Sequence, residues 1–246
     1  MGSRTVGGSV LAVATNATGE RQDRPDRGAT GLDGVLRALR ALRPGSCGAP
    51  GPPLCCTWVC SAVVGEVRDH GLADGGPVVA GDLELDAEFA AVLVRRFAGR
   101  YLRVVADRAE GRPVPAAWQL LLDRPPARPA RLALAGVRTL LCYDLTLAFV
   151  GACTVLGRTP GRREHDIHGR VAALLGTCVR ELVRRTGDPV EMVEAARLDS
   201  PALRDTVWQR AEHLWALRGR PAEAEEERDA LDREVRADAL RVLSGA

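Results

Sequence analysis

The sequence contains no lysine and few aromatic residues. All 34 basic residues are arginines, and aromatic residues make up only 4% of the 246 residues. A hydrophobic core must therefore be built mainly from leucine, valine and alanine. Arginine and acidic residues are interleaved and the formal net charge is only +2, so the sequence has no basic stripe of the kind that binds nucleic acid. We therefore predict no nucleic-acid partner.

Long uncharged apolar runs are also absent. No stretch of about 18 such residues occurs, which argues against a membrane span, and the apolar piece at residues 10–14 is too short for a secretory signal. The seven cysteines include no C-x-x-C pair, which is typical of free thiols in a reducing compartment. We therefore predict a cytoplasmic protein with no membrane partner.

The apolar residues recur at helical spacing, and no strand pattern is found. The pattern predicts an all-α fold, with a disordered N-terminal tail over residues 1–30 and a single helical domain over residues 31–246. Residues 132–156 are apolar on every side, so a central buried helix at about 130–156 is expected, with the other helices bundled around it. The remaining predicted helices span residues 32–42, 54–67, 83–107, 116–123, 166–185, 190–198, 201–218 and 222–243.

Three residues of the predicted central helix are candidate catalytic groups. Asp144 lies in an otherwise apolar stretch, and a buried carboxylate must be paired, hydrogen-bonded or protonated. Such a group is a candidate acid or base, with Tyr143 beside it to handle protons. Arg138 is a candidate for binding an oxyanion or phenolate. The alternative for both charged residues is a structural ion pair with a neighbouring helix.

Scarce aromatic and polar side chains are candidates for lining a substrate pocket. Trp208 and Trp215 are seven residues apart and share a helix face, which is more often a core pattern than a ligand-binding one. Cys142 shares a face with Arg138 at i, i+4. The candidate substrate-binding residues are Trp118, Tyr101, Cys142, His168 and Trp208.

His165 and His168 have a spacing that is compatible with a metal site. They are three residues apart and can share a helix face, with Asp144 as a third ligand if the two helices pack antiparallel. The alternative is an exposed, polar first helical turn, which is the more common use of such residues. We predict no bound metal. No glycine-rich nucleotide motif follows a strand, so no cofactor is predicted either.

Three segments together resemble a known family. They are FAGRYLRVVADRAEGRPVPAAWQLLLD (97–123), LALAGVRTLLCYDL (132–145) and the Arg/Trp pattern over 204–217. In order and spacing they are similar to an actinobacterial family of domains of unknown function, numbered 5995, over about residues 54–246. The resemblance implies a helical fold and assigns no activity.

The resemblance also draws attention to one polar run in the central helix. The family run reads roughly G-M-N-A-H-I-N-x-D-L, and this chain retains Gly136, Asp144 and Leu145 of it. The histidine position holds Leu140, and the two asparagine positions hold Arg138 and Cys142. If the run is a metal or catalytic site in the family, the resemblance implies that this chain has lost most of it, which favours a repurposed pocket.

Several functions remain open from the sequence. The first is a small-molecule tailoring enzyme of secondary metabolism, acting by acid/base chemistry on a hydrophobic, aromatic or polyketide-like substrate between helices, through cyclisation, dehydration or group transfer. The second is a non-catalytic carrier or resistance protein that binds such a metabolite. The third is a metal-dependent hydrolase that uses Asp144, His165 and His168. A structural protein whose charged terminal helix packs in a homodimer is a further alternative.

Overall fold

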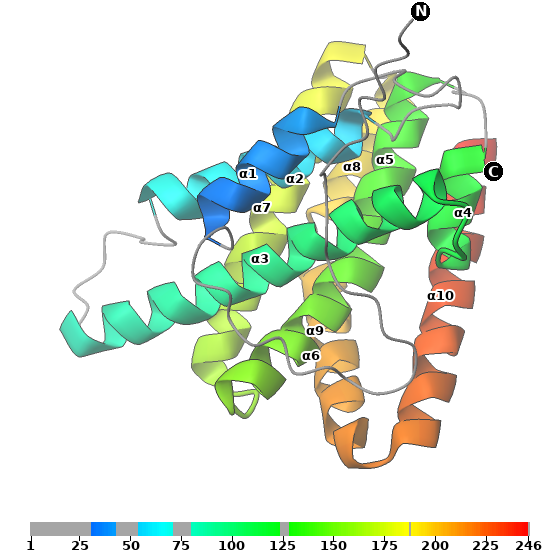
Figure 1. Ribbon diagram of the computed structural model, residues 1–246. Helices are drawn as coiled ribbons and strands as arrows, with labels where there is room; N and C mark the ends of the chain where they lie inside the picture. Colours follow the sequence, from blue (N-terminus) through cyan, green and yellow to red (C-terminus); the bar gives the residue numbers. More distant parts are fainter. Residues whose placement is uncertain (1–30, 43–53, 71–79, 124–127, 187, 246) are drawn as a thin grey trace, which may run out of the picture.

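A computed structural model describes residues 31–42, 54–70, 80–123, 128–186 and 188–245 of the chain (Figure 1). These residues form helices and contain no strand, which confirms the all-α prediction. The predicted disordered tail, residues 1–30, and Cys47 lie outside the described residues. The six cysteines within them are free thiols.

Proline and glycine residues mark the ends of several helices. Pro129, Pro189, Pro201 and Pro221 each stand in the first turn of a helix, where a missing amide hydrogen costs little. Gly157 ends α6 in the left-handed conformation that glycine adopts without strain. The elements are α1 (Leu32–Ala41), α2 (Leu54–His70), α3 (Ala80–Ala109), α4 (Ala116–Asp123), α5 (Pro129–Thr139), η1 (Leu140–Leu145), α6 (Thr146–Leu156), α7 (Arg162–Thr186), α8 (Pro189–Leu198), α9 (Pro201–Ala216), η2 (Leu217–Gly219) and α10 (Pro221–Ser244).

The predicted central helix is formed by α5, η1 and α6 in direct succession. It packs against α3, α7, α9 and α10, and α3 crosses the front of the molecule in Figure 1. Among the described helices it alone is long and apolar enough to cross a membrane, but 67% of its apolar window is buried inside the molecule. Burial of this kind is the pattern of a core helix in a soluble protein, and the cytoplasmic location stays a prediction.

The middle of this central helix is a π-helical turn. Residues 140–145 adopt the wider π geometry, a rare feature that often marks functional sites. Two buried threonines flank it. The hydroxyl of Thr139 donates to the carbonyl of Ala135 at 3.0 Å, and that of Thr146 donates to the carbonyl of Cys142 at 2.8 Å. Both hydroxyls are thereby satisfied inside the core, at the two places where the helix changes its winding.

Helix α2 approaches the central helix closely at Gly136. A β-carbon added to Gly136 would lie 2.4 Å from the sulfur of Cys56, well inside van der Waals contact. The Cys56 side chain is fully buried and occupies the space that the glycine leaves. The absence of a side chain at position 136 therefore sets the distance between α2 and α5, one turn before the π-helical segment.

Candidate active site around Asp144

Asp144 is the centre of a buried polar cluster. Its side chain is completely buried in the π-helical turn, and each carboxylate oxygen accepts a hydrogen bond. The Nε of Arg100 donates to Oδ1 at 3.1 Å, and the indole Nε1 of Trp118 donates to Oδ2 at 2.8 Å. The donors come from α3 and α4, so the carboxylate ties both helices to the central one.

Arg100 connects this cluster to the solvent. Its side chain is 31% exposed, whereas that of Asp144 is 0% exposed. The guanidinium carbon lies 5.4 Å from the centre of the Tyr143 ring, a favourable cation–π arrangement. Tyr143 is 8% exposed and belongs to the same π-helical turn. The solvent-exposed part of the cluster is therefore mainly the Arg100 side chain, with a small part of Tyr143.

The position of Trp118 depends on a carboxylate from the C-terminal helix. Asp232 of α10 accepts hydrogen bonds from the backbone amides of Ala116 and Ala117, at 2.7 and 3.0 Å. These amides belong to the first turn of α4, where no helical carbonyl is available to them and a negative charge is favoured. Asp232 therefore fixes the start of the short helix that presents the Trp118 indole to Asp144.

Tyr101 packs against Trp118 inside the core. The two rings lie 5.3 Å apart and both side chains are fully buried. The Tyr101 hydroxyl shares a hydrogen bond of 2.8 Å with the hydroxyl of Thr57 on α2. Tyr101 and Trp118, both predicted to bind substrate, thus lie together beside Asp144 but hold its surroundings in place from within the core.

Burial changes the acidity of the site. The loss of hydration raises the pKa of Asp144 to about 6, although the Arg100 charge and the two hydrogen bonds favour the ionised form. Burial likewise raises the pKa of the Tyr143 hydroxyl to about 12, so this phenol stays protonated at neutral pH. The site therefore combines a carboxyl group that titrates near neutral pH, a neutral phenol and a partly exposed cation.

Arg138, the candidate for binding a substrate oxyanion, forms an ion pair with another helix. Its Nε donates to Asp238 of α10 at 2.9 Å, and a second hydrogen bond joins its Nη2 to the same oxygen. Cys142 is buried, and the loss of hydration raises its pKa, while the charge of Arg138 acts in the opposite direction. The structure thus pairs Arg138 with Asp238 of α10 and Asp144 with Arg100 of α3, in each case the ion pair with a neighbouring helix that the sequence left open as the alternative.

His168 and Trp208 lie in a second, aromatic cluster. The His168 ring is 5.5 Å from that of Phe149 and 5.6 Å from that of Trp208, and its side chain is fully buried. Within the residues that the structure describes, neither ring nitrogen of His168 has a hydrogen-bond partner. Burial lowers the pKa of His168 to about 3, so the ring is neutral at physiological pH. These two predicted substrate-binding residues are packed against each other between α6, α7 and α9.

The three residues of the metal hypothesis do not form a metal site. Within the described part of the chain, no group of three or more histidine, cysteine, aspartate or glutamate side chains is placed to hold a metal ion. Asp144 is bound to Arg100 and Trp118, and His165 packs its ring 4.8 Å from that of Trp208. The geometry therefore gives no support to a hydrolase built on Asp144, His165 and His168.

Comparison with known proteins gives one match. Residues 79–244, which include α3 to α10, match a family of unknown function, DUF5995. The chain belongs to DUF5995. No curated protein and no solved structure matches it. The DUF5995 match contains Arg100, Trp118, Asp144 and Asp232, so the whole polar cluster lies within the part of the chain that defines the family.

Sequence reasoning missed two residues of this site. Arg100 and Asp232 are separated from the groups they bind by 44 and more than 110 residues. The sequence offers one clue to Arg100. It is the neighbour of the candidate residue Tyr101, in the same DUF5995 segment as Trp118. Asp232 is one of many acidic residues of a charged terminal helix, and nothing in the local sequence distinguishes it.

Proposed function

We propose that this chain is a small-molecule enzyme that moves a proton on a carbonyl-containing, hydrophobic substrate, with Arg100, Tyr143 and Asp144 as its working groups. The supporting observation is the fully buried Asp144, held in a π-helical turn by Arg100 and Trp118 and titrating near pH 6. A carboxyl group whose pKa lies close to the working pH can both accept and return a proton. The substrate class that suits this chemistry is an aromatic or polyketide-like ketone.

Arg100 and Tyr143 supply the contacts for the substrate oxygen. When a proton leaves a carbon beside a carbonyl group, negative charge develops on the carbonyl oxygen. A partly exposed guanidinium and a phenol that stays protonated can both donate hydrogen bonds to that oxygen. Tyr143 belongs to the π-helical turn and Arg100 packs against its ring, so the two donors lie close together before the substrate arrives.

The ion pair between Arg100 and Asp144 links substrate binding to proton transfer. When Arg100 turns its guanidinium toward the carbonyl oxygen of the bound substrate, Asp144 loses a nearby positive charge and a hydrogen bond. Both changes raise the pKa of a carboxylate and make it a stronger base. Asp144 therefore becomes a better proton acceptor at the moment when the substrate occupies Arg100, and Trp118 continues to hold Oδ2.

Deuterium uptake from solvent tests this proposal without knowledge of the net reaction. The protein is incubated in D2O at pH 7 with a panel of aromatic ketones and 1,3-diketones, and the mass of each compound is followed over time. We expect at least one compound to take up deuterium faster with the wild-type protein than in buffer. Asp144→Asn is expected to reduce the enzymatic rate by about 100-fold or more.

The matched control is Asp205→Asn, which makes the same chemical change at an exposed position of α9. This variant should exchange at the wild-type rate. Equal rates for wild-type and folded Asp144→Asn protein, or no acceleration for any compound of the panel, would contradict the proposal. Circular dichroism of each variant establishes that the comparison is made between folded proteins.

One observation favours a non-catalytic binding protein as the second candidate. Both oxygens of Asp144 already accept a hydrogen bond and the side chain has no exposed surface. A carboxylate of this kind also suits a structural ion pair, in which Asp144 holds Arg100 in place for an anionic ligand. Tight binding of a panel compound with no deuterium uptake, and with Arg100→Gln abolishing that binding, would select this candidate over the enzyme.

A further inference from the structure

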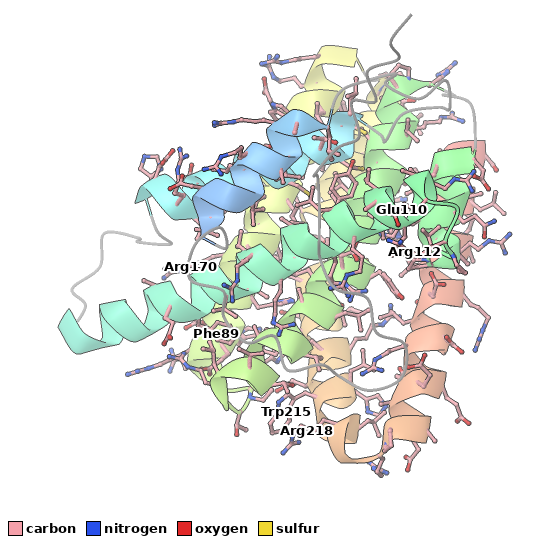
Figure 2. The ribbon with its side chains drawn as sticks, viewed as in Figure 1. Phe89, Glu110, Arg112, Arg170, Trp215 and Arg218 are labelled. Atoms are coloured by element: carbon pink, nitrogen blue, oxygen red, sulfur yellow. The ribbon has the colours of Figure 1, made fainter. Side chains whose placement is uncertain are left out.

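A surface hollow lies away from Asp144, where the end of α6 meets the end of α9. It has a volume of about 270 Å³ and is lined by residues 153, 154 and 157–159 of the first segment and by Trp215 and Arg218 of the second. Figure 2 shows Trp215 and Arg218 side by side at this end of the molecule. The volume equals that of about nine water molecules in the liquid, which suits a small molecule of roughly ten heavy atoms.

Arg218 uses only part of its hydrogen-bonding capacity. Its guanidinium carbon lies 3.5 Å from the centre of the Trp215 ring, so that the cation covers one face of the indole. Its Nη1 donates to the backbone carbonyl of Trp215 at 3.2 Å. Within the described residues no carboxylate pairs with Arg218, and its Nε and Nη2 have no partner.

The edge of the Arg218 guanidinium that carries Nε and Nη2 has the geometry to bind a carboxylate. Two parallel N–H groups in the guanidinium plane match the two oxygens of a carboxylate in a bidentate pair. Stacking on Trp215 restricts the rotation of Arg218, so less side-chain entropy is lost when the pair forms. An exposed arginine held in this way is better prepared for an anion than one that moves freely.

The rest of the hollow supplies a second arginine and a hydroxyl group. Arg158 lines the hollow, but its charge is paired with Glu164 at 3.2 Å, and its guanidinium carbon lies 5.4 Å from the centre of the Phe89 ring. Thr159 adds an exposed hydroxyl. Cys153 borders the hollow from the core side, with a side chain that is 0% exposed.

We propose that this hollow is a binding site for a small aromatic carboxylate, with the carboxylate on the free edge of Arg218 and the ring against the exposed part of Trp215. A bare inorganic anion would satisfy Arg218 but leave this part of Trp215 uncovered, which is why a flat apolar body is part of the expected ligand. The site is built from α6, α9 and the residues that follow them, and the groups around Asp144 take no part in it.

Benzoate and inorganic phosphate distinguish the two kinds of anion. The indole N–H signal of Trp215 is assigned in a ¹⁵N–¹H spectrum by its loss in Trp215→Phe, and each anion is titrated at constant ionic strength. We expect benzoate to shift this signal saturably, with phosphate at least 10-fold weaker. A shift of equal affinity with phosphate would overturn the aromatic carboxylate, and no saturable shift with either anion would overturn the site.

Variants of the arginine locate the binding. Arg218→Gln should weaken benzoate binding at least 10-fold, and Arg218→Lys should weaken it less, because it keeps the charge but loses the fork. Arg236→Gln, at an exposed arginine of α10, is the matched control and should bind as the wild type does. Unchanged binding in Arg218→Gln would overturn the proposal. Asp144→Asn should bind benzoate normally, so this test stands apart from that of the proposed function.

Discussion

The indole Nε1 of Trp118 donates a 2.8 Å hydrogen bond to Oδ2 of Asp144, and both side chains are fully buried. This bond joins the short helix α4 to the π-helical turn of the central helix. Because Asp232 of α10 holds the first turn of α4, three segments far apart in the sequence meet at one carboxylate. The acidity of Asp144 therefore depends on how these segments pack.

Removing the indole donor should destabilise the protein and make Asp144 less acidic. Trp118→Phe keeps an aromatic ring but leaves Oδ2 without its hydrogen bond. An unsatisfied buried group of this kind costs about 1–3 kcal/mol, so the free energy of unfolding in urea should fall by at least that amount. The pKa of Asp144 should rise above that of the wild type, because the Trp118 hydrogen bond lowers it.

Trp208→Phe is the matched control for this substitution. Trp208 is also largely buried among aromatic rings, but it donates no hydrogen bond within the described residues. It should lose packing energy without changing the pKa of Asp144. If Trp118→Phe and Trp208→Phe have the same effect on both quantities, the hydrogen bond to Asp144 contributes nothing beyond packing.

The raised pKa of Asp144 predicts a distinct dependence of stability on pH. The folded value of about 6 lies above the ordinary value of 3.8, so the folded state holds a proton that the unfolded state has lost between these pH values. The Asp144 contribution to stability is therefore fully present below pH 4 and is lost as the pH rises through 6. The loss amounts to about 3 kcal/mol.

Asp144→Asn removes this dependence. The wild type loses this stability as the pH rises, and the variant does not. The free energy of unfolding of Asp144→Asn minus that of the wild type should therefore increase by about 3 kcal/mol from pH 3.5 to pH 7. Urea titrations of both proteins at several pH values measure the difference. A difference that stays constant over this range would mean that Asp144 is not protonated in the folded state near pH 6.

His168 should have the opposite effect on acid stability. Burial among Phe149 and Trp208 lowers its pKa from 6.5 to about 3, and His165 adds a smaller contribution in the same direction. The unfolded state therefore binds a proton that the folded state does not bind, and the free energy of unfolding falls as the pH drops below 6.5. This loss is about 3 kcal/mol between pH 6.5 and pH 4.

His168→Leu tests this directly. The substitution removes two buried nitrogens that have no hydrogen-bond partner among the described residues, so the variant should be more stable than the wild type at pH 7, by about 1 kcal/mol. Its advantage should grow on acidification, measured by urea unfolding at pH 7 and pH 4. A variant that is less stable than the wild type at both pH values would indicate that the His168 ring has a polar role in the folded protein.

Gly136→Ala should disturb the contact between α2 and the central helix. The added β-carbon would meet the Cys56 sulfur at 2.4 Å, so one of the two helices must move. Overpacking of this kind costs about 1–3 kcal/mol. In the double variant Cys56→Ala, Gly136→Ala the clash is gone, and the two effects should be clearly non-additive in a double-mutant cycle. Simple additivity would contradict the close approach.

Most helices could be located from the sequence because they are set by local signals. The apolar run at 132–156 and the prolines and glycines around it predict the buried helix that the structure places at residues 129–156. The helix at 116–123 has the predicted bounds. The π-helical turn within 140–145 could not be predicted, because the sequence pattern of an apolar helix is the same for either winding.

The candidate site was only partly predictable. Asp144 stands out in the sequence because a carboxylate in an apolar helix requires a partner, but the partner is chosen by packing. Arg138 was the nearest arginine in the sequence, yet Asp238, 100 residues away, binds it. Arg100 reaches Asp144 because α3 crosses the central helix at the π-helical turn, a relationship that no local spacing contains.

The most direct test concerns the proton on Asp144. A protein labelled with ¹³C at its aspartate carboxyl carbons is titrated by NMR, and the Asp144 signal is identified by its absence from Asp144→Asn. We expect this signal to titrate with a midpoint near pH 6, two units above an ordinary aspartate. A midpoint at or below pH 4 would show a permanently ionised partner of Arg100, and would contradict a role for Asp144 in proton transfer.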